Sequence, residues 1–172
     1  MLKGQNMAST ITKELVRQIT LRGIADIMFD RYAGDNKTQL PPWEKFYKDQ
    51  KGGLVLPALN ISSLLSAQNT SSAPKRFLDA KQYKKVAQAL LSYISINPFL
   101  IPITRGGKQI RPLNPVDDED VEAGLYIHRC VARLDKGIPN PKIRPVIRAP
   151  WEISFSITIL PNDEFNEEML RG

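Results

Sequence analysis

Cationic side chains gather in one stretch of the sequence, residues 129–148. Six lysines and arginines lie there against a single acid, Asp135, so six charges minus one give the stretch a formal charge of +5. The basic residues are Arg129, Arg133, Lys136, Lys142, Arg144 and Arg148. Guanidinium and ammonium groups at this density are the groups that neutralise a polyanion such as a phosphate backbone. The valines, isoleucines and prolines between them are typical of two strands joined by a turn.

The geometry of this hairpin decides whether the charges act together. If residues 125–134 pair with residues 142–148 as antiparallel strands, side chains two apart share a face. The resulting rows are Lys142, Arg144 and Arg148 on the second strand, and Arg129 and Arg133 on the first. Like charges side by side repel, and a bound phosphate backbone removes that cost. We therefore expect a polyanion site, and the alternative is a solvated hairpin whose arginines, with Pro145, protect a sheet edge.

Basic and aromatic residues elsewhere add to the expected interface. Lys75, Arg76, Lys84 and Lys85 are further candidates for phosphate contacts. Residues 33–53 concentrate turn formers and lysines, and we expect them to leave the sheet as a long excursion. The aromatics in this excursion, Trp43, Phe46 and Tyr47, are candidates for stacking on bases. Packing onto the body of the protein is the commoner use of such side chains, and both uses stay open.

Catalytic groups are harder to find. Acid–base or nucleophilic catalysis needs partners, and the single histidine, His128, has no serine or aspartate beside it in the sequence. A strand histidine next to Cys130 is more often a core or edge residue. The acidic run at 117–120 has oxygen ligands that suit magnesium, but four consecutive acids point in different directions, as in a solvated loop. No phosphate-binding glycine loop and no HExxH motif is present, so we expect no metal and no cofactor.

Length and composition predict a single domain spanning residues 1–172. Of these 172 residues 42% are hydrophobic, which is enough for one core and too few for two comfortable ones. The net charge of +6 and a pI near 9.5 favour phosphate-rich partners. A single cysteine excludes an internal disulfide and a cysteine-rich zinc site. No apolar run reaches the roughly 18 residues of a membrane span, so we expect a cytoplasmic protein without a membrane partner.

The elements that must position these residues alternate between strands and helices. Residues 15–29 are apolar at alternate positions and predict one long strand with a bend at Gly23. Two helices follow, capped by Asn60 and Asp79. The later elements are a hairpin turning at residues 106–107, a half-buried strand at 151–159 and a helix starting at Asn162. This order predicts an α+β fold of the ferredoxin-like or RRM-like (split βαβ) type, an antiparallel sheet with helices on one face and extended hairpin insertions.

Three segments resemble the RAMP superfamily, and most of all the Cas7-like backbone proteins of CRISPR effector complexes. They are ITLRGIADIMF with the following YAGDN, LVLPALNISSLLS, and IRPVIRAPWEISFSITILPNDEFNEEML. The resemblance implies that the strand–proline–helix element, through Asn60 and Ser62, and a hairpin thumb hold guide RNA by its backbone, independent of sequence. The glycine-rich loop of that family is not found, so either a last strand lies outside this sequence or the fold is completed differently. A phage-encoded form of the family is among the expectations.

Three functions follow from these observations. The leading expectation is a non-catalytic protein that binds RNA or another single strand and associates with itself or within a multisubunit complex. The second is a structural or interaction protein, such as a phage accessory factor, whose basic hairpin contacts protein. The third is an RNA endonuclease, because some RAMP nucleases use a lone histidine assisted by tyrosine or lysine. The resemblance then implies His128 with Tyr126 and Arg129 as the catalytic site.

Overall fold

The computed structural model describes residues 11–35, 38–66, 80–113, 118–133, 139–164 and 167, without the side chains of residues 80–85, 132 and 133. The backbone groups into two compact units. Unit 1 combines Met1–Ile19, Pro57–Phe99 and Phe155–Gly172, and unit 2 combines Thr20–Leu56 and Leu100–Ser154.

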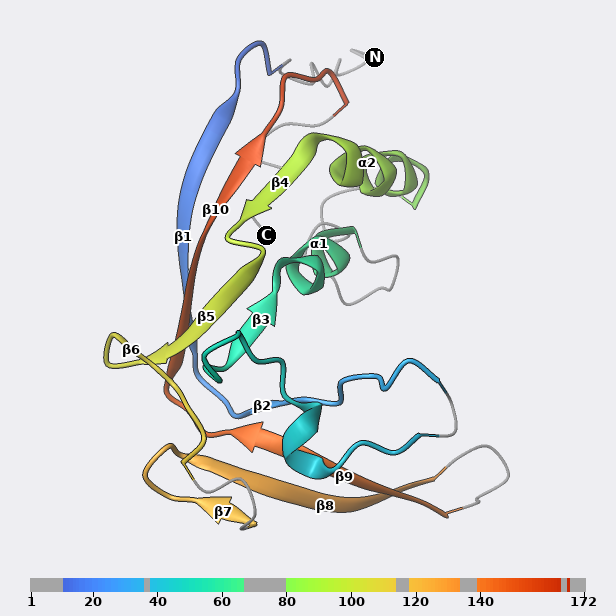
Figure 1. Cartoon of the computed structure of the whole chain (residues 1–172). Coiled ribbons are helices and arrows are strands. Elements are labelled where there is room, and N and C mark those ends of the chain that lie inside the picture. Colours follow the sequence, from blue (N-terminus) through green and yellow to red (C-terminus); the bar gives the residue numbers. More distant parts are fainter. Residues whose placement is uncertain are drawn as a thin grey trace. The chain divides into compact units, whose positions relative to one another are not determined.

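The fold is α+β, as predicted, with mostly antiparallel sheets and two helices in the described residues (Figure 1). The elements are β1 (Leu15–Gly23), β2 (Ile27–Met28), the 3-10 helix η1 (Pro42–Lys45), β3 (Val55–Pro57), α1 (Ala58–Ser66), α2 (Ala80–Tyr93), β4 (Ile94–Asn97), β5 (Leu100–Arg105), β6 (Lys108–Gln109), β7 (Glu119–Asp120), β8 (Leu125–Arg133), β9 (Pro139–Ile147) and β10 (Trp151–Ile159). One sheet has the order β1-β10-β5-β3, with β4 also on β10 and β6 on β5. The other has the order β2-β9-β8-β7.

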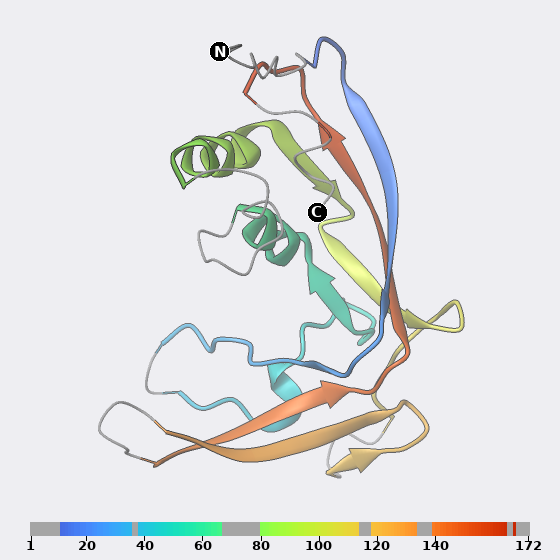
Figure 2. The ribbon, with the colours of Figure 1, turned by 180° about the vertical axis from the view of Figure 1, so that it is seen from behind.

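Unit 1 is built from the two helices and the C-terminal half of β10. Strand β4 pairs antiparallel with β10, from Ile94 opposite Ile159 to Asn97 opposite Ser156. Helix α1 packs on α2 and on β4, and Figure 2 shows the two helices side by side. Buried apolar side chains of both helices and of β10 form the core, namely Ala58, Ile61, Val86, Ala87, Leu90, Ile157 and Ile159. Burial of this apolar stripe holds the helices in place.

The predicted cap of the first helix is wrong. Helix α1 begins at Ala58, so Asn60 lies inside its first turn rather than before it. Pro57 has no amide hydrogen, and the amide of Ala58 donates to the carbonyl of Phe99 at 2.8 Å. A backbone partner therefore satisfies a donor that a side-chain cap would otherwise serve. The predicted cap of the second helix, Asp79, lies outside the described residues.

Unit 2 holds the basic hairpin. Strands β8 and β9 pair from Leu125 opposite Ile147 to Arg133 opposite Pro139, so the predicted strand pair is confirmed and β9 starts earlier than predicted. The loop that contains η1 packs against β9. The buried core of this unit includes Phe29, Trp43, Phe46, Leu54, Val55, Ile101, Ile103, Leu125 and Ile147. Rings from the loop and from the segment after β2 meet there, because Phe46 lies 5.2 Å from Phe29 and 5.8 Å from Trp43 between ring centres.

The predicted long strand at 15–29 is wrong, although its bend at Gly23 is found. Strand β1 ends at Gly23, and β2 belongs to the sheet of the basic hairpin, where Ile27 lies opposite Ile147. A Cβ at Gly23 would overlap the indole of Trp151, whose Nε1 donates to the carbonyl of Ala25 at 2.9 Å. Close approach of the indole therefore requires glycine here and fixes the point where the strand breaks.

The hairpin predicted at residues 106–107 is confirmed. Strand β5 pairs with β6, with Arg105 opposite Lys108, and both glycines of the turn have positive φ, 55° at Gly106 and 76° at Gly107. Two-residue turns of this kind match the twist of the strands they join.

Because nothing crowds a Cβ at position 107, only backbone strain penalises a side chain there. We expect Gly107→Ala to lower the free energy of unfolding by about 1 kcal/mol and Gly107→Asn to lower it less, because asparagine tolerates left-handed backbone. Denaturant unfolding of the two variants checks this. Equal stability of both variants and the native chain would contradict the assignment of this turn.

Candidate nucleic-acid interface

The register of β8 against β9 assigns each hairpin residue to a face of the sheet. Residues directly opposite one another in an antiparallel pair point the same way, and successive residues alternate. His128 lies opposite Arg144, whereas Arg129 lies opposite Ile143. We call the side that carries His128 and Arg144 the outer face. The polar side chains that β8 and β9 place there are Tyr126, His128, Cys130, Asn140, Lys142, Arg144 and, directly after β9, Arg148.

The two faces differ in burial. On the opposite side, the core face, Leu125, Ile127, Pro145 and Ile147 are buried. The polar side chains of the outer face are all at least partly exposed. Val146 is the apolar member of the outer face and is buried between its cross-strand neighbours. A sheet with one packed face and one accessible polar face results, which is common for antiparallel sheets.

The predicted basic cluster is divided between these faces. Lys142, Arg144 and Arg148 share the outer face, as predicted for the second strand, but Arg129, which was predicted to share a face with Arg133, starts from the core face. Of these two, the structure describes only the Arg129 side chain, which is exposed because the hairpin extends past the packed part of that face. Among the side chains that the structure describes, the outer face therefore carries three cations of the hairpin, and Arg129 is not one of them.

Carboxylates partner the described hairpin arginines, which also differs from the expectation of an unopposed cationic surface. Arg144 Nε lies 2.8 Å from Asp30, and Arg148 lies 2.6 Å from Glu119. On the other face Arg129 lies 2.8 Å from Asp118. Lys142 has no ion pair with any described residue. The repulsion between neighbouring cations is thus relieved within the protein, and any phosphate must compete with these carboxylates.

Two of the competing carboxylates come from the acidic run that was expected to form a solvated loop. Its residues 119–120 form β7, which pairs with β8 so that Glu119 lies opposite Tyr126. Alternation sends Glu119 to the outer face and Asp118 to the other, each toward an arginine. Asp120 is buried and accepts from the amides of Leu113 and Ala123 at 2.6 and 3.0 Å. The sequence signal was the four-residue spacing to β8 closed by a glycine, which is typical of a hairpin.

Asp30 links the outer face to the loop that contains η1, because it is ion-paired with a residue of each. Its carboxylate lies 2.8 Å from Arg144 and 3.1 Å from the ammonium of Lys45, which also donates to the carbonyl of Ile143 at 2.7 Å. Burial raises the pKa of Asp30, but the hydrogen bonds from Arg144 and Lys45 together outweigh it, and the pKa is lowered. One acid between two cations leaves this triad with a net charge of +1.

The lowered pKa of Asp30 gives a pH dependence with a defined sign. A carboxyl whose pKa is lower in the folded state stabilises the fold above its unfolded pKa of about 3.9 and loses this effect as the pH falls through the folded value. We expect the difference in free energy of unfolding between the native chain and Asp30→Asn to be largest near pH 7 and to shrink below about pH 4. Denaturant unfolding across this range measures it, and a difference independent of pH would rule out the charged triad.

Tyr126 is fixed at the base of the outer face. Its hydroxyl donates to Asp26 at 3.0 Å, and the guanidinium of Arg148 lies 4.9 Å from the centre of its ring. The amide of Ala149, and next to it the Tyr126 hydroxyl, lower the pKa of Asp26 by hydrogen bonding. Burial, followed by the bond to Asp26, raises the pKa of Tyr126. Arg148 is thus held over an aromatic ring by a cation–π contact as well as by Glu119.

The predicted stacking residues are mostly unsuitable. Trp43 and Phe46 are only 7% and 2% exposed, because they fill the core between the loop and the sheet. Of the two uses left open, burial therefore favours packing onto the body for these two rings. Tyr47 is half-buried and lines a cleft of about 350 Å³ with Arg31 and Lys48. The sequence could not separate these roles residue by residue, since aromatic side chains serve both cores and stacking surfaces.

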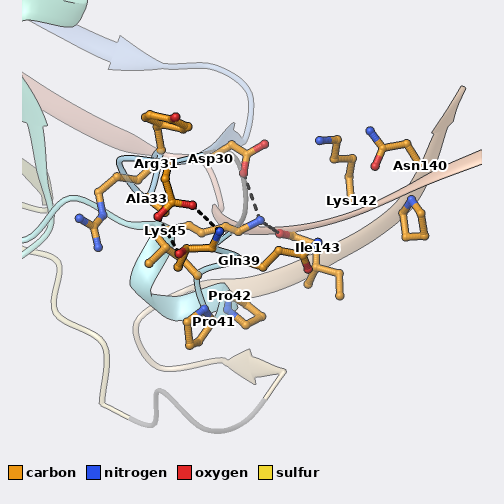
Figure 3. A pocket seen from close by; sticks show the side chains of 15 residues that line it. Asp30, Arg31, Ala33, Gln39, Pro41, Pro42, Lys45, Asn140, Lys142 and Ile143 are labelled. Atoms are coloured by element: carbon orange, nitrogen blue, oxygen red, sulfur yellow. Dashed lines mark hydrogen bonds and ion pairs between the residues drawn. The ribbon is translucent and has the colours of Figure 1, made fainter. Parts of the chain in front are cut away.

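A second, larger cleft of about 710 Å³ lies beside β9 (Figure 3). Residues 30–33, Asp35 and residues 38–42 form one wall, and residues 140–143 of β9 form the other. Lys45 and Lys142 both line it, together with Asp30. Tyr32 on its rim is 62% exposed. This cleft continues the outer face at the edge of the hairpin, and no sequence pattern pointed to it.

The remaining predicted contacts lie elsewhere. Asn60 is exposed on α1 in unit 1, and the hydroxyl of Ser62 donates to the carbonyl of Ala58 at 3.3 Å. The family-like role of Ser62 in phosphate binding is therefore weakened by a bond within its own helix. The side chains that fall outside the described residues are those of Lys75, Arg76, Lys84, Lys85, Arg133 and Lys136.

The predicted catalytic grouping is only partly assembled. Tyr126 and His128 share the outer face, but Arg129 points the other way, and the Tyr126 hydroxyl is engaged with Asp26. No three His, Cys, Asp or Glu side chains among the described residues are placed to hold a metal ion. On the outer face His128 lies opposite Arg144, with Tyr126 and Cys130 as its neighbours on the same strand.

Comparisons with known proteins give no family. No protein-family model matches the chain, and searches of curated proteins and of solved structures find no match either. Within the residues that the structure describes, no helix has the length and apolar character needed to cross a membrane. The function must therefore be argued from the geometry of unit 2.

Proposed function

We propose that this chain binds single-stranded nucleic acid, RNA in preference to duplex DNA, through its backbone and without catalysis. The observation that carries the proposal is the row of Lys142, Arg144 and Arg148 on the accessible outer face of the hairpin sheet. Alternate residues of an antiparallel strand point to the same face and recur about every 6.8 Å. Lys142 and Arg144 are one such repeat apart, and Arg144 and Arg148, with Val146 between them, are two repeats apart, so the three cations form a line along β9 that a phosphate backbone can follow.

The ion pairs on the outer face are compatible with this role. Exposed ion pairs contribute only about 0–1 kcal/mol, so a phosphate can replace Glu119 beside Arg148, where both partners are nearly half exposed. The carboxylates prevent repulsion between the cations before the strand binds. They also compete with a single phosphate ion for the arginines. A strand displaces them more readily, because it offers several phosphates at once.

RNA is favoured over duplex DNA by the shape of the surface. Single strands present unstacked bases to open antiparallel sheet faces, where aromatic rings and flat guanidinium groups stack on them. The outer face offers the imidazole of His128 beside the row of cations.

The RAMP-like, split βαβ architecture is part of the proposal. It is supported by the strand order, in which β10 lies between β1 and the strands β4 and β5 that follow the helices. Insertion of a later strand between the two strands of a βαβ unit defines the split motif. In this proposal unit 1 is the helical layer of that motif and the β8–β9 hairpin is its RNA-contacting thumb, and several copies associate along one strand.

Salt dependence distinguishes the proposal from a protein-binding hairpin. Three phosphate contacts to a single strand give a slope of log affinity against log salt of about −2, so raising salt from about 50 to about 200 mM should weaken binding about 20-fold. Fluorescence anisotropy with a short labelled RNA measures this, and the RNA should be recovered intact. Absence of binding at low salt would favour the interaction protein, and cleavage that disappears in His128→Ala would favour the nuclease.

A further inference from the structure

The cleft beside β9 contains ammonium donors that the fold does not use. The Lys45 ammonium has three hydrogens, and its two described acceptors are Asp30 and the carbonyl of Ile143. One Lys45 donor therefore remains for the cleft. Lys142 lines the same cleft and has no ion pair or hydrogen bond to a described residue. Figure 3 shows the Lys142 side chain directed toward the side on which Asp30 lies, with Lys45 held between Asp30 and Ile143.

The charge balance around these donors calls for an anion. The triad of Asp30, Lys45 and Arg144 has a net charge of +1, and Lys142 raises it to +2. Asp35, the other acid of the cleft, is bound to the amide and hydroxyl of Thr38 at 2.6 and 2.8 Å on the loop wall. These hydrogen bonds hold the Asp35 carboxylate on the loop wall. The wall formed by β9 therefore carries the positive charge of Lys142.

An extended peptide is a poor occupant of this cleft. Pro139 and Pro141 lack amide donors, and Lys45 already occupies the carbonyl of Ile143. The edge of β9 that borders the cleft therefore offers few backbone groups for strand addition. The volume of the cleft, about 710 Å³, lies in the range of pockets for nucleotide-sized molecules.

We propose that this cleft is an anion site that takes one phosphate group of the bound strand on Lys142 and on the free hydrogen of the Lys45 ammonium. The assignment rests on the proposed function and deepens it, because it places one nucleotide of the strand at the edge of β9, with the exposed ring of Tyr32 on the cleft rim. The phosphate is either an internal phosphodiester or a terminal monoester, since both present the same oxygens to the lysines.

The test uses two variants with the same charge change, Lys142→Gln in the cleft and Arg148→Gln on the outer face away from it. Inorganic phosphate is titrated into the full chain, and amide resonances of Thr38 and Asn140, on the two cleft walls, are followed by NMR. We expect shifts in the native chain and in Arg148→Gln, loss of these shifts in Lys142→Gln, and their return in Lys142→Arg. For a short RNA, Lys142→Gln should weaken binding about 5- to 10-fold.

Titrations with two RNAs, one with and one without a 5′-phosphate, distinguish a terminal phosphate from an internal phosphodiester in the cleft. A preference of about 10-fold or more for RNA with a 5′-phosphate assigns the terminal group, and equal binding with and without it assigns a phosphodiester. RNA binding without any phosphate-induced shift at the cleft walls would overturn the anion site and leave the proposed function standing. Shifts with inorganic phosphate in a chain that binds no RNA would overturn the proposed function and the assignment to a strand, and would leave an anion site alone.

Discussion

Replacing Lys142, Arg144 and Arg148 together with alanine is expected to lower affinity for single-stranded RNA about 100-fold at low salt. Each lost phosphate contact removes about 1 kcal/mol after competition with Asp30 and Glu119, so three contacts give about 3 kcal/mol. The salt slope should fall from about −2 to near zero, because no counterions are then released at these positions. Anisotropy titrations at several salt concentrations measure both quantities.

The matched control removes three arginines from other surfaces. Arg17, Arg22 and Arg129 are each ion-paired, with Glu167, Glu152 and Asp118 respectively, and none lies on the outer face. Their triple alanine variant has the same net charge as the first. It should bind RNA within about threefold of the native chain, since only long-range attraction is lost. An equal loss in both triple variants would show that binding depends on net charge alone and would contradict a defined interface.

Reversing the charge of Glu119 is expected to raise RNA affinity about 10-fold. Glu119 competes with phosphate for Arg148 at 2.6 Å, and Glu119→Lys removes this competitor and adds a cation to the outer face. The two effects together are worth about 1.4 kcal/mol at exposed positions, which is a factor of ten in affinity. The salt slope should also steepen by about 0.7, one further contact to a single strand.

Asp118→Lys is the control for this variant. Asp118 precedes Glu119 in the chain and pairs with Arg129 on the opposite side of the sheet. The change in net charge is identical, so long-range attraction rises equally in both variants. We expect Asp118→Lys to change affinity by less than about threefold. A larger gain from Asp118→Lys than from Glu119→Lys would place the RNA on the other face.

The two strands of the hairpin could be predicted from the sequence, but which residues of β8 lie on the same face as which residues of β9 could not. Alternation within 125–134 and 142–148 fixes which residues of one strand point together. Whether Arg129 then lies on the same face as Arg144 depends on the pairing register. A shift of one residue in that register would move every side chain of one strand to the other face. The structure places His128, and not Arg129, opposite Arg144. Sequence alone does not specify that register, because the segment between the strands has no two-residue turn signal that would set it.

The carboxylate partners were missed for a related reason. Residues 117–120 read as a solvated loop, because consecutive acids rarely enter a strand. Pairing of β7 with β8 separates Glu119 and Asp118 onto two faces, where each meets an arginine. Asp30 meets Arg144 across 114 positions of the chain, a contact that no local pattern encodes. The α+β class follows from local periodicity, whereas the charge balance of the interface depends on these long-range contacts.

The position of the RNA relative to the two faces of the hairpin is the most direct test of the central claim. Cys130 is the single cysteine and lies on the outer face, while its neighbour Val131 points the other way and is 63% exposed. A thiol-linked photo-crosslinker is attached to Cys130, or to a cysteine at position 131 in a Cys130→Ser background. The account predicts crosslinking of bound RNA from position 130 and little from position 131. Equal crosslinking from both positions, or crosslinking from position 131 alone, would contradict it.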